Sequence, residues 1–315
     1  MKYSRMKYLG LIALGMMWLQ GCASVPGPDE NTPAVEDLSS ENLDLLFATE
    51  FPVASKDEAL MKAASAYRDG KFDEAQFYLI RALKFDRGDT EVLGQIGNLH
   101  ARQGNLVLAA RAFQFALHQD PGHAVSLEGL GLLYFKAGND DEARKHLEQA
   151  VASEPELWRS FNTLGVIADN QKEFELAESY YDTALEIQPL ADSVLINRGY
   201  SRYLSGDYNE AALDFYTVAQ RGNSEKAWLN LALVYAKQGW YEDALETFLR
   251  IGKESYAYNE IGVIAMSNGD TEEALHYLTE AVRVSPTYFA QAEKNLAELR
   301  KKDQGIYRDS TSYAN

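Results

Sequence analysis

A side-chain pattern that returns every 34 residues constrains the fold of this chain more than any other feature of its sequence. Glycines and prolines recur at this spacing, at Gly70, Gly104, Gly138, Pro121, Pro155 and Pro189. Within each copy, small and bulky apolar residues follow one another at intervals of three, four and seven, which is the periodicity of a helix and not of a strand. An internal repeat of this length predicts two antiparallel helices per unit, each unit burying its apolar face against the next.

Two copies of the pattern are especially clear. The first consists of Leu127, Leu130, Gly131, Tyr134, Gly138, Ala143, Leu147, Ala150 and Pro155. The second consists of Trp228, Leu231, Ala232, Tyr235, Gly239, Ala244 and Phe248. These residues resemble the tetratricopeptide repeat, a helix-turn-helix unit. The resemblance implies an all-α fold, a right-handed α-solenoid of about seven helical hairpins over residues 56–288. An amphipathic segment at 289–302 is then predicted to cap the array, and residues 303–315 to form a flexible tail.

One alanine marks each copy, at Ala75, Ala109, Ala143, Ala177, Ala211, Ala244 and Ala274. The sixth copy loses about one helical turn near Ile251 and Gly252. Two interpretations of the shortening remain open, a seam between two sub-arrays or a deletion tolerated in a loop. Acidic residues just after the turn glycines are predicted to cap the second helices, because Asp207 with Glu210 and Asp270 with Glu273 stand at capping-box spacing.

The start of the chain carries a different signal. Basic residues precede an apolar run at 9–19, which is followed by Leu19-Gln20-Gly21-Cys22. The run is about half of the roughly 20 residues that span a bilayer, which predicts a secretory signal over residues 1–21. The tetrapeptide resembles a bacterial lipobox, and Cys22 is the chain's single cysteine. The alternative is an incidental cysteine after an ordinary signal.

The lipobox resemblance implies a covalent diacylglycerol and an N-acyl chain on Cys22, with no other cofactor. Residues 22–55 would then be the lipidated cysteine and a flexible, proline-containing tether. Because Ala23 is not the aspartate associated with inner-membrane retention, the resemblance implies a lipid anchor at the periplasmic face of the outer membrane.

Composition narrows the possible partners. The formal net charge is −17, and removing 1–21 with its three basic residues leaves −17 − 3 = −20. Such a chain repels phosphate backbones, so no nucleic acid is expected as partner. The five histidines show no metal-ligand spacing, and no nucleophile has an evident base. We therefore expect no enzyme activity, no metal site and no small-molecule substrate.

The remaining expectation is that the chain binds another protein through the shape of its surface. In the repeat frame the first helices of successive units line a concave groove that accepts a segment of another protein. The frame places on this partner-binding groove the residues Asn98, Arg102, Glu128, Phe135, Lys136, Arg159, Asn162, Asp169, Asn170, Tyr200, Tyr203, Tyr256 and Asn259. Asparagine amides can bond a partner's backbone, and tyrosines combine apolar area with a polar hydroxyl. Trp240 follows a turn glycine and is predicted to be exposed, as a minor contact candidate.

The segments Ile196–Tyr208 and Ala227–Tyr235 look most like the Tad (tight adherence) Flp pilus assembly lipoproteins, a group considered together with type IV pilotins. This resemblance implies a noncatalytic outer-membrane scaffold that helps a secretin or other pilus components to assemble. The alternative partner is an envelope enzyme, with the chain as an adaptor that recruits a periplasmic protease or a peptidoglycan hydrolase to its substrates.

Overall fold

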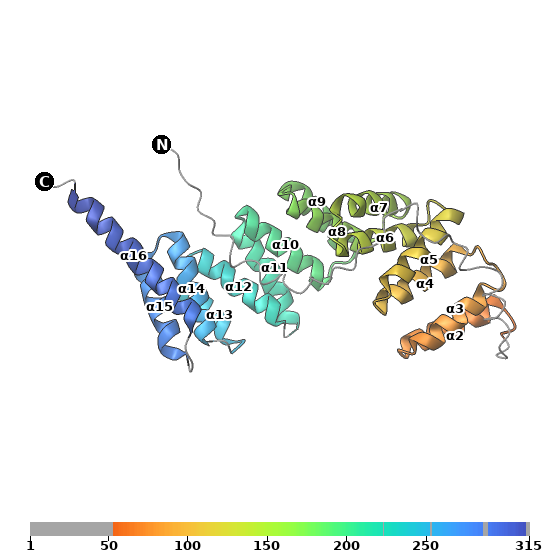
Figure 1. Ribbon diagram of the computed structural model, residues 1–315, viewed down its shortest axis with the longest axis horizontal. Helices are drawn as coiled ribbons and strands as arrows, with labels where there is room; N and C mark the ends of the chain where they lie inside the picture. Colours follow the sequence, from red (N-terminus) through yellow and green to blue (C-terminus); the bar gives the residue numbers. More distant parts are fainter. Residues whose placement is uncertain (1–52, 223, 253, 286–288, 313–315) are drawn as a thin grey trace. The chain divides into compact units, whose positions relative to one another are not determined.

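The computed structural model describes residues 53–222, 224–252, 254–285 and 289–312, with side chains described as far as Lys301. The predicted signal peptide, Cys22 and nearly all of the predicted tether lie outside the described residues. Every regular element within the described ranges is an α-helix, and these ranges contain no β-strand (Figure 1). The all-α prediction is therefore confirmed.

The chain divides into two compact units, residues 1–167 and 168–315, and the boundary falls inside helix α8. The helices of the first unit, ending with the one that crosses the boundary, are α2 (Lys56–Arg68), α3 (Phe72–Ala82), α4 (Thr90–Arg102), α5 (Leu106–Gln119), α6 (Ala124–Lys136), α7 (Asp140–Ser153) and α8 (Trp158–Asn170). They alternate as first and second helices of successive repeats. In the pairs α2 with α3, α4 with α5, and α6 with α7, the first helix ends at a tight turn and the second helix folds back against it.

The second unit continues the same alternation. Its helices are α9 (Phe174–Ile187), α10 (Asp192–Ser205), α11 (Tyr208–Arg221), α12 (Glu225–Lys237), α13 (Tyr241–Leu249), α14 (Glu254–Asn268), α15 (Thr271–Val284) and α16 (Ala290–Ser312). In the described part of the chain, α2 to α15 make seven pairs of consecutive helices, as the repeat count predicts. The terminal helix α16 packs against α15 and α14.

Glycines inside the first helices allow neighbouring helices to approach a bulky side chain closely. A Cβ atom added to Gly97 would lie 2.4 Å from Cε1 of Phe113, and one added to Gly129 would lie 2.3 Å from its Cζ. Phe113 is fully buried between these two helices, α4 and α6. Large and small residues therefore interlock across repeats, which explains why the sequence alternates them.

The turn after each first helix requires a left-handed residue. Gly70, Gly104 and Gly138 have φ values of +73°, +81° and +78°. The fourth repeat has Lys172 at the equivalent position, with φ 63°, and it is the one described non-glycine residue with positive φ. The turn geometry is thus kept where the glycine is lost, at a steric cost that glycine would avoid.

The capping-box prediction is wrong in its detail. Asp207 and Asp270 precede α11 and α15, but neither side chain caps its helix. The carboxylate of Asp207 accepts a hydrogen bond from Ser205 Oγ at 3.1 Å, and that of Asp270 accepts one from the Tyr241 hydroxyl. A competing hydroxyl donor has drawn each carboxylate away from the helix amides.

The shortened sixth repeat is present as predicted, because α13 has 9 residues whereas α11 and α15 have 14. It is not a seam between sub-arrays. One core cluster continues across it and includes Ala232, Phe248, Ala257 and Ile261. The division into units falls instead at residues 167 and 168.

The terminal helix was predicted to end at residue 302, and this is also wrong, because α16 continues to Ser312. The segment 303–312 offers little to bury, but it contains no proline, and a helix can satisfy its own backbone hydrogen bonds while in solvent.

Candidate protein-binding surface

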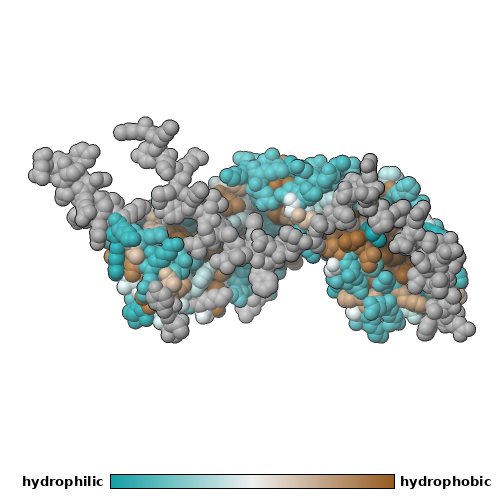
Figure 2. Space-filling model, in the orientation of Figure 1, coloured by the Kyte–Doolittle hydropathy of each residue, from teal (hydrophilic) through white to brown (hydrophobic). Residues whose placement is uncertain are grey.

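The predicted groove residues of the first unit lie on first helices and are mostly accessible. Asn98 and Arg102 on α4 and Lys136 on α6 are exposed, and Phe135 is partly buried. Figure 2 shows apolar surface over the α4 to α6 part of the molecule, bordered by hydrophilic surface. This part of the chain therefore combines basic, amide and aromatic groups that a protein ligand could contact.

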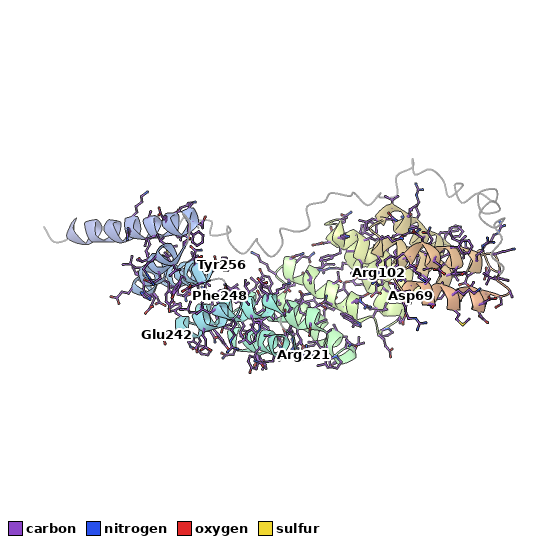
Figure 3. The ribbon with its side chains drawn as sticks, turned by 90° about the horizontal axis from the view of Figure 1, so that it is seen from below. Asp69, Arg102, Arg221, Glu242, Phe248 and Tyr256 are labelled. Atoms are coloured by element: carbon purple, nitrogen blue, oxygen red, sulfur yellow. The ribbon has the colours of Figure 1, made fainter. Side chains whose placement is uncertain are left out.

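Arg102 is held in place by the preceding repeat (Figure 3). Its guanidinium carbon lies 5.0 Å from the ring centroid of Tyr67 and 5.4 Å from that of Phe72, and Nη1 donates a 2.9 Å hydrogen bond to the Tyr67 hydroxyl. Stacking over two rings orients the guanidinium without neutralising its charge. The side chain is thus a pre-oriented cation at the surface.

Glu128 on α6 is less available than the frame suggests. Its Oε1 accepts a 2.9 Å hydrogen bond from Ser160 Oγ. Burial raises the pKa of the Glu128 carboxyl, while the hydrogen bond from Ser160 and the positive charge of Arg159 act in the opposite direction. Arg159 itself is exposed, and its guanidinium lies 4.6 Å from the ring centroid of Trp158.

In the second unit, Asp169 is used inside the protein. Its two carboxylate oxygens accept hydrogen bonds from the Tyr181 hydroxyl at 2.7 Å and from Ser201 Oγ at 2.5 Å. Tyr181 is fully buried, and burial raises the pKa of both the Asp169 carboxyl and the Tyr181 phenol. The carboxylate connects residues of α9 and α10 and has little capacity left for a partner.

Three tyrosines of the second unit lie together in the structure. Tyr200 and Tyr203 were predicted to line the groove, and Tyr208 was not. The rings of Tyr200 and Tyr203 stack with centroids 6.4 Å apart, and those of Tyr203 and Tyr208 lie 5.7 Å apart. Burial raises the pKa of Tyr203 to about 12. All three side chains are partly buried and in contact with one another, so they form an aromatic strip along the end of α10 and the start of α11.

The two predicted asparagines in the fourth repeat lie on α8. Asn162 is partly buried and Asn170 is exposed. Both already take part in an interaction within the protein. Binding through either amide would therefore compete with an existing contact.

The prediction that Asn259 faces an open groove is wrong. Its side chain is only 1% exposed, because α16 covers it, and Asn295 Nδ2 of α16 donates a 3.0 Å hydrogen bond to its Oδ1. Its amide in turn donates to Glu260 Oε1 at 3.1 Å. Tyr256, one turn earlier, is partly buried with its ring at 6.1 Å from Phe248 in an edge-to-face contact (Figure 3). The seventh repeat is thus closed by the terminal helix.

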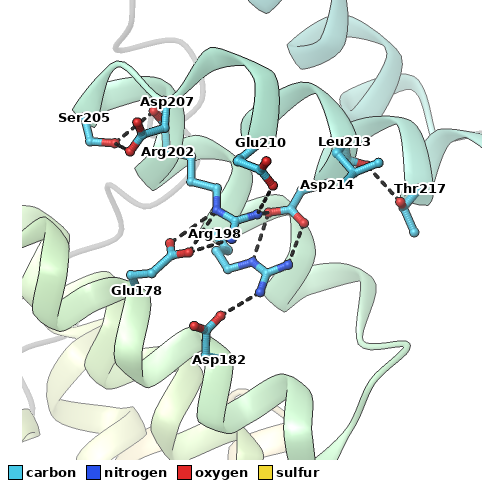
Figure 4. A network of polar contacts seen from close by, with 10 residues as sticks. All are labelled: Glu178, Asp182, Arg198, Arg202, Ser205, Asp207, Glu210, Leu213, Asp214 and Thr217. Atoms are coloured by element: carbon cyan, nitrogen blue, oxygen red, sulfur yellow. Dashed lines mark hydrogen bonds and ion pairs between the residues drawn. The ribbon is translucent and has the colours of Figure 1, made fainter.

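Sequence reasoning missed a charged network that connects three helices of the second unit (Figure 4). Asp214 on α11 accepts hydrogen bonds from Arg198 Nε at 3.0 Å, Arg198 Nη2 at 2.7 Å and Arg202 Nη1 at 2.8 Å. The same two arginines reach Asp182 and Glu178 on α9, each at 2.6 Å. The sequence signal was the i, i+4 spacing of both pairs, which places each pair on one helix face.

Within the described residues, no group of three or more His, Cys, Asp or Glu side chains could hold a metal ion. Helices in the same described ranges are all too short or too polar to cross a bilayer.

Paired antiparallel helices, interlocked glycines and phenylalanines, and accessible first helices define an α-helical repeat protein. Models of the tetratricopeptide repeat match residues 60–124, 100–161, 162–226, 196–259 and 255–288. The chain therefore belongs to the tetratricopeptide repeat family, whose members generally act by binding other proteins.

Solved structures show the same fold. A tetratricopeptide repeat protein from Parabacteroides merdae is 18% identical with a TM-score of 0.51, covering 79% of this chain and 100% of that one. Pseudomonas aeruginosa PilF is 18% identical with a TM-score of 0.50, covering 82% and 99%. The anaphase-promoting complex assembly Cut9–Hcn1 gives 17% identity and a TM-score of 0.54, covering 84% of this chain and 52% of that one.

Proposed function

We propose that this protein is a noncatalytic, lipid-anchored scaffold that binds a segment of another protein along its first helices. The observation that carries the proposal is the aromatic strip of Tyr200, Tyr203 and Tyr208, since its rings are partly exposed and already fixed by one another. Rings that are rigid before binding lose little conformational entropy on binding, and tyrosine is enriched at interface hot spots.

We further propose that the partner is a secretin or another component of a Tad/Flp-type pilus, assembled at the periplasmic face of the outer membrane. Support comes from the lipobox-like sequence ending at Cys22 and from the likeness of residues 196–208 and 227–235 to the Tad group. The second candidate is an adaptor that presents an envelope protease or peptidoglycan hydrolase to its substrates, which the same accessible first helices would serve.

The anchor is tested by palmitate labelling in cells. Labelling should be lost in Cys22→Ser, and continued labelling of this variant would disprove lipidation at that residue. The pilus role is tested by deleting the gene, which should reduce secretin multimers and surface pili. Normal multimers and normal piliation, together with co-purification of an envelope hydrolase, would favour the adaptor instead.

The binding surface is tested by capturing the purified secretin on the immobilised protein. Tyr203→Ala should weaken capture by about tenfold or more, as expected for a central aromatic contact. Leu275→Ala is the matched control, because Leu275 is 42% exposed but lies on the second helix α15. Circular dichroism should show equal helicity for both variants. Equal capture by both would place the interaction elsewhere.

A further inference from the structure

A second cluster of exposed apolar side chains lies outside the predicted groove residues. Leu213 and Tyr216 on α11 and Trp240 immediately before α13 are 58%, 47% and 49% exposed. The ring of Trp240 lies 5.7 Å from that of Tyr235 on α12. We call these four residues the α11–α13 patch. Large aromatic and aliphatic groups in one place, on a chain this acidic, are the composition of an interaction surface.

The helices beneath the patch are firmly held. Gln238 Nε2 at the end of α12 donates a 2.7 Å hydrogen bond to Asn209 Oδ1 at the start of α11. Between Leu213 and Tyr216, Asp214 and Phe215 point inward and are 3% and 1% exposed. The exposed pair is thus carried by a stretch of helix whose other face is fixed in the core and in the charged network.

Tyr235 is a residue of the repeat frame, but the frame does not require an apolar residue at the positions of Trp240 and Leu213. Trp240 stands four residues before the marker alanine of its repeat, and the other six copies have there Lys71, Asn105, Asn139, Glu173, Asp207 and Asp270. Leu213 stands two residues after its marker, where the first copy has Phe77 and the other five copies have Arg111, Lys145, Ser179, Glu246 and His276. Solvent-facing positions of a repeat helix are normally polar. Packing within the fold therefore does not account for the exposed Leu213 and Trp240 side chains.

Acidic side chains border the patch. Glu242 and Asp243 occupy the first turn of α13, two and three residues after Trp240, are exposed, and make no ion pair with any described residue. Burial raises the pKa of the Tyr235 phenol, and the charges of Asp243 and Tyr216 raise it further. Both residues therefore lie near Tyr235. Acidic side chains are favourable in the first turn of a helix because they interact with the positive end of its dipole. This interaction does not supply a cation to pair with them.

The cations closest in sequence are engaged elsewhere. Lys237 Nζ bonds to Ser267 Oγ at 3.2 Å and to Asn268 Oδ1 at 2.9 Å. Arg250 pairs with Glu246 at 3.3 Å and lies over the ring of Trp228 at 4.9 Å. Among the described residues, no lysine or arginine forms an ion pair with Glu242 or Asp243, so the patch has an apolar centre and a negatively charged border.

We propose that the α11–α13 patch docks a helical segment of a partner protein whose apolar side chains are flanked by lysine or arginine. The apolar face would cover Leu213, Tyr216 and Trp240, and the basic residues would meet Glu242 and Asp243. A second copy of this chain is a poor occupant, because it would bring the same acidic border against itself. This surface is additional to the proposed binding along the first helices.

The test uses the purified full chain and a fluorescein-labelled amphipathic helix of leucine and lysine, with binding measured by fluorescence anisotropy at physiological salt. Trp240→Ala should weaken binding by about tenfold or more. Leu275→Ala should leave binding unchanged. The double variant Glu242→Gln/Asp243→Asn should weaken binding and reduce its dependence on salt.

The control for charge is Glu272→Gln/Glu273→Gln. Relative to the marker alanines, these glutamates occupy in α15 the same frame positions as Glu242 and Asp243 in α13, and α15 lacks a tryptophan before them. The control should bind the peptide as the unaltered chain does. If both charge variants weaken binding equally, general attraction to an acidic protein explains the result and the proposal fails.

Two further outcomes would overturn it. A leucine and glutamate peptide that binds as tightly as the basic one would show that the acidic border selects nothing. If Tyr203→Ala weakens binding while Trp240→Ala does not, the peptide occupies the first helices. The patch would then be rejected and the proposed function would stand. Far-UV circular dichroism of every variant confirms that the helices are intact.

Discussion

Asp214 is predicted to contribute more to the stability of the second unit than any other carboxylate of its network. The perturbation is Asp214→Ala, compared with Asp182→Ala. Both acids bond to Arg198, but the Asp214 side chain is 3% exposed whereas that of Asp182 is 50% exposed. The two substitutions thus remove the same kind of partner from the same guanidinium, one in a buried setting and one in water.

The magnitude follows from what the alanine leaves behind. Asp214 accepts three hydrogen bonds from two arginines whose side chains are only 17% and 13% exposed. Removing one partner of a buried ion pair costs about 3–5 kcal/mol. Because Asp182 and Glu178 still bond to the arginines, we expect the lower end, about 3 kcal/mol. Asp182→Ala should cost about 1 kcal/mol or less, as is usual for exposed pairs.

The assay is urea unfolding followed by far-UV circular dichroism and tryptophan fluorescence. A loss of about 3 kcal/mol should lower the midpoint of the second unit's transition by about 1 M or more. Hydrogen exchange of the α10 amides reports the same unit if the two units unfold separately. Equal midpoints for the two variants would refute the reasoning, because burial would then not decide the strength of the network.

Two other substitutions test the packing and the buried carboxylates. Gly129→Ala should destabilise the first unit by about 1–3 kcal/mol, because the new methyl group overlaps Phe113, whereas Gly122→Ala in a surface turn should change the urea midpoint little. Burial raises the pKa of Glu260 above its ordinary value of 4.5, so the stability linked to its bound proton is present below that value and is lost as the pH rises through the folded-state pKa. Glu260→Gln should therefore raise the urea midpoint at neutral pH and flatten the fall in stability above about pH 4.5.

The fold could be predicted because the repeat length and the packing residues carry the same information many times. The interval of 34 residues sets the helix pairs, and pairs such as Gly129 with Phe113 repeat the same requirement in three dimensions. What failed was local. Asp270 has capping-box spacing, but the Tyr241 hydroxyl competes for its carboxylate, and that contact depends on a residue 29 positions away.

The exposure of the predicted groove residues could be predicted only in repeats that have another repeat on each side. Tyr200 and Tyr203 follow the frame, and the structure places them side by side. Asn259 follows the same frame but belongs to the last repeat, where α16 takes the place of a following unit and buries the amide. A frame transferred from copy to copy cannot show what covers the final copy.

Two residues differ in polarity from their equivalents in the other repeats, and the structure compensates for only one of them inside the protein. Tyr181 is buried at a position where the other repeats from the second to the sixth have the apolar residues Phe113, Leu147, Phe215 and Phe248. Burying its hydroxyl without a hydrogen-bond partner would be unfavourable. The partner lies within the protein, because the Asp169 carboxylate accepts a hydrogen bond from the Tyr181 hydroxyl. Trp240 is a departure of the opposite kind, an apolar group placed where the frame has polar ones, and half of it remains in water. One side of its ring contacts Tyr235, and the exposed side is the part of the α11–α13 patch that we propose a partner helix covers.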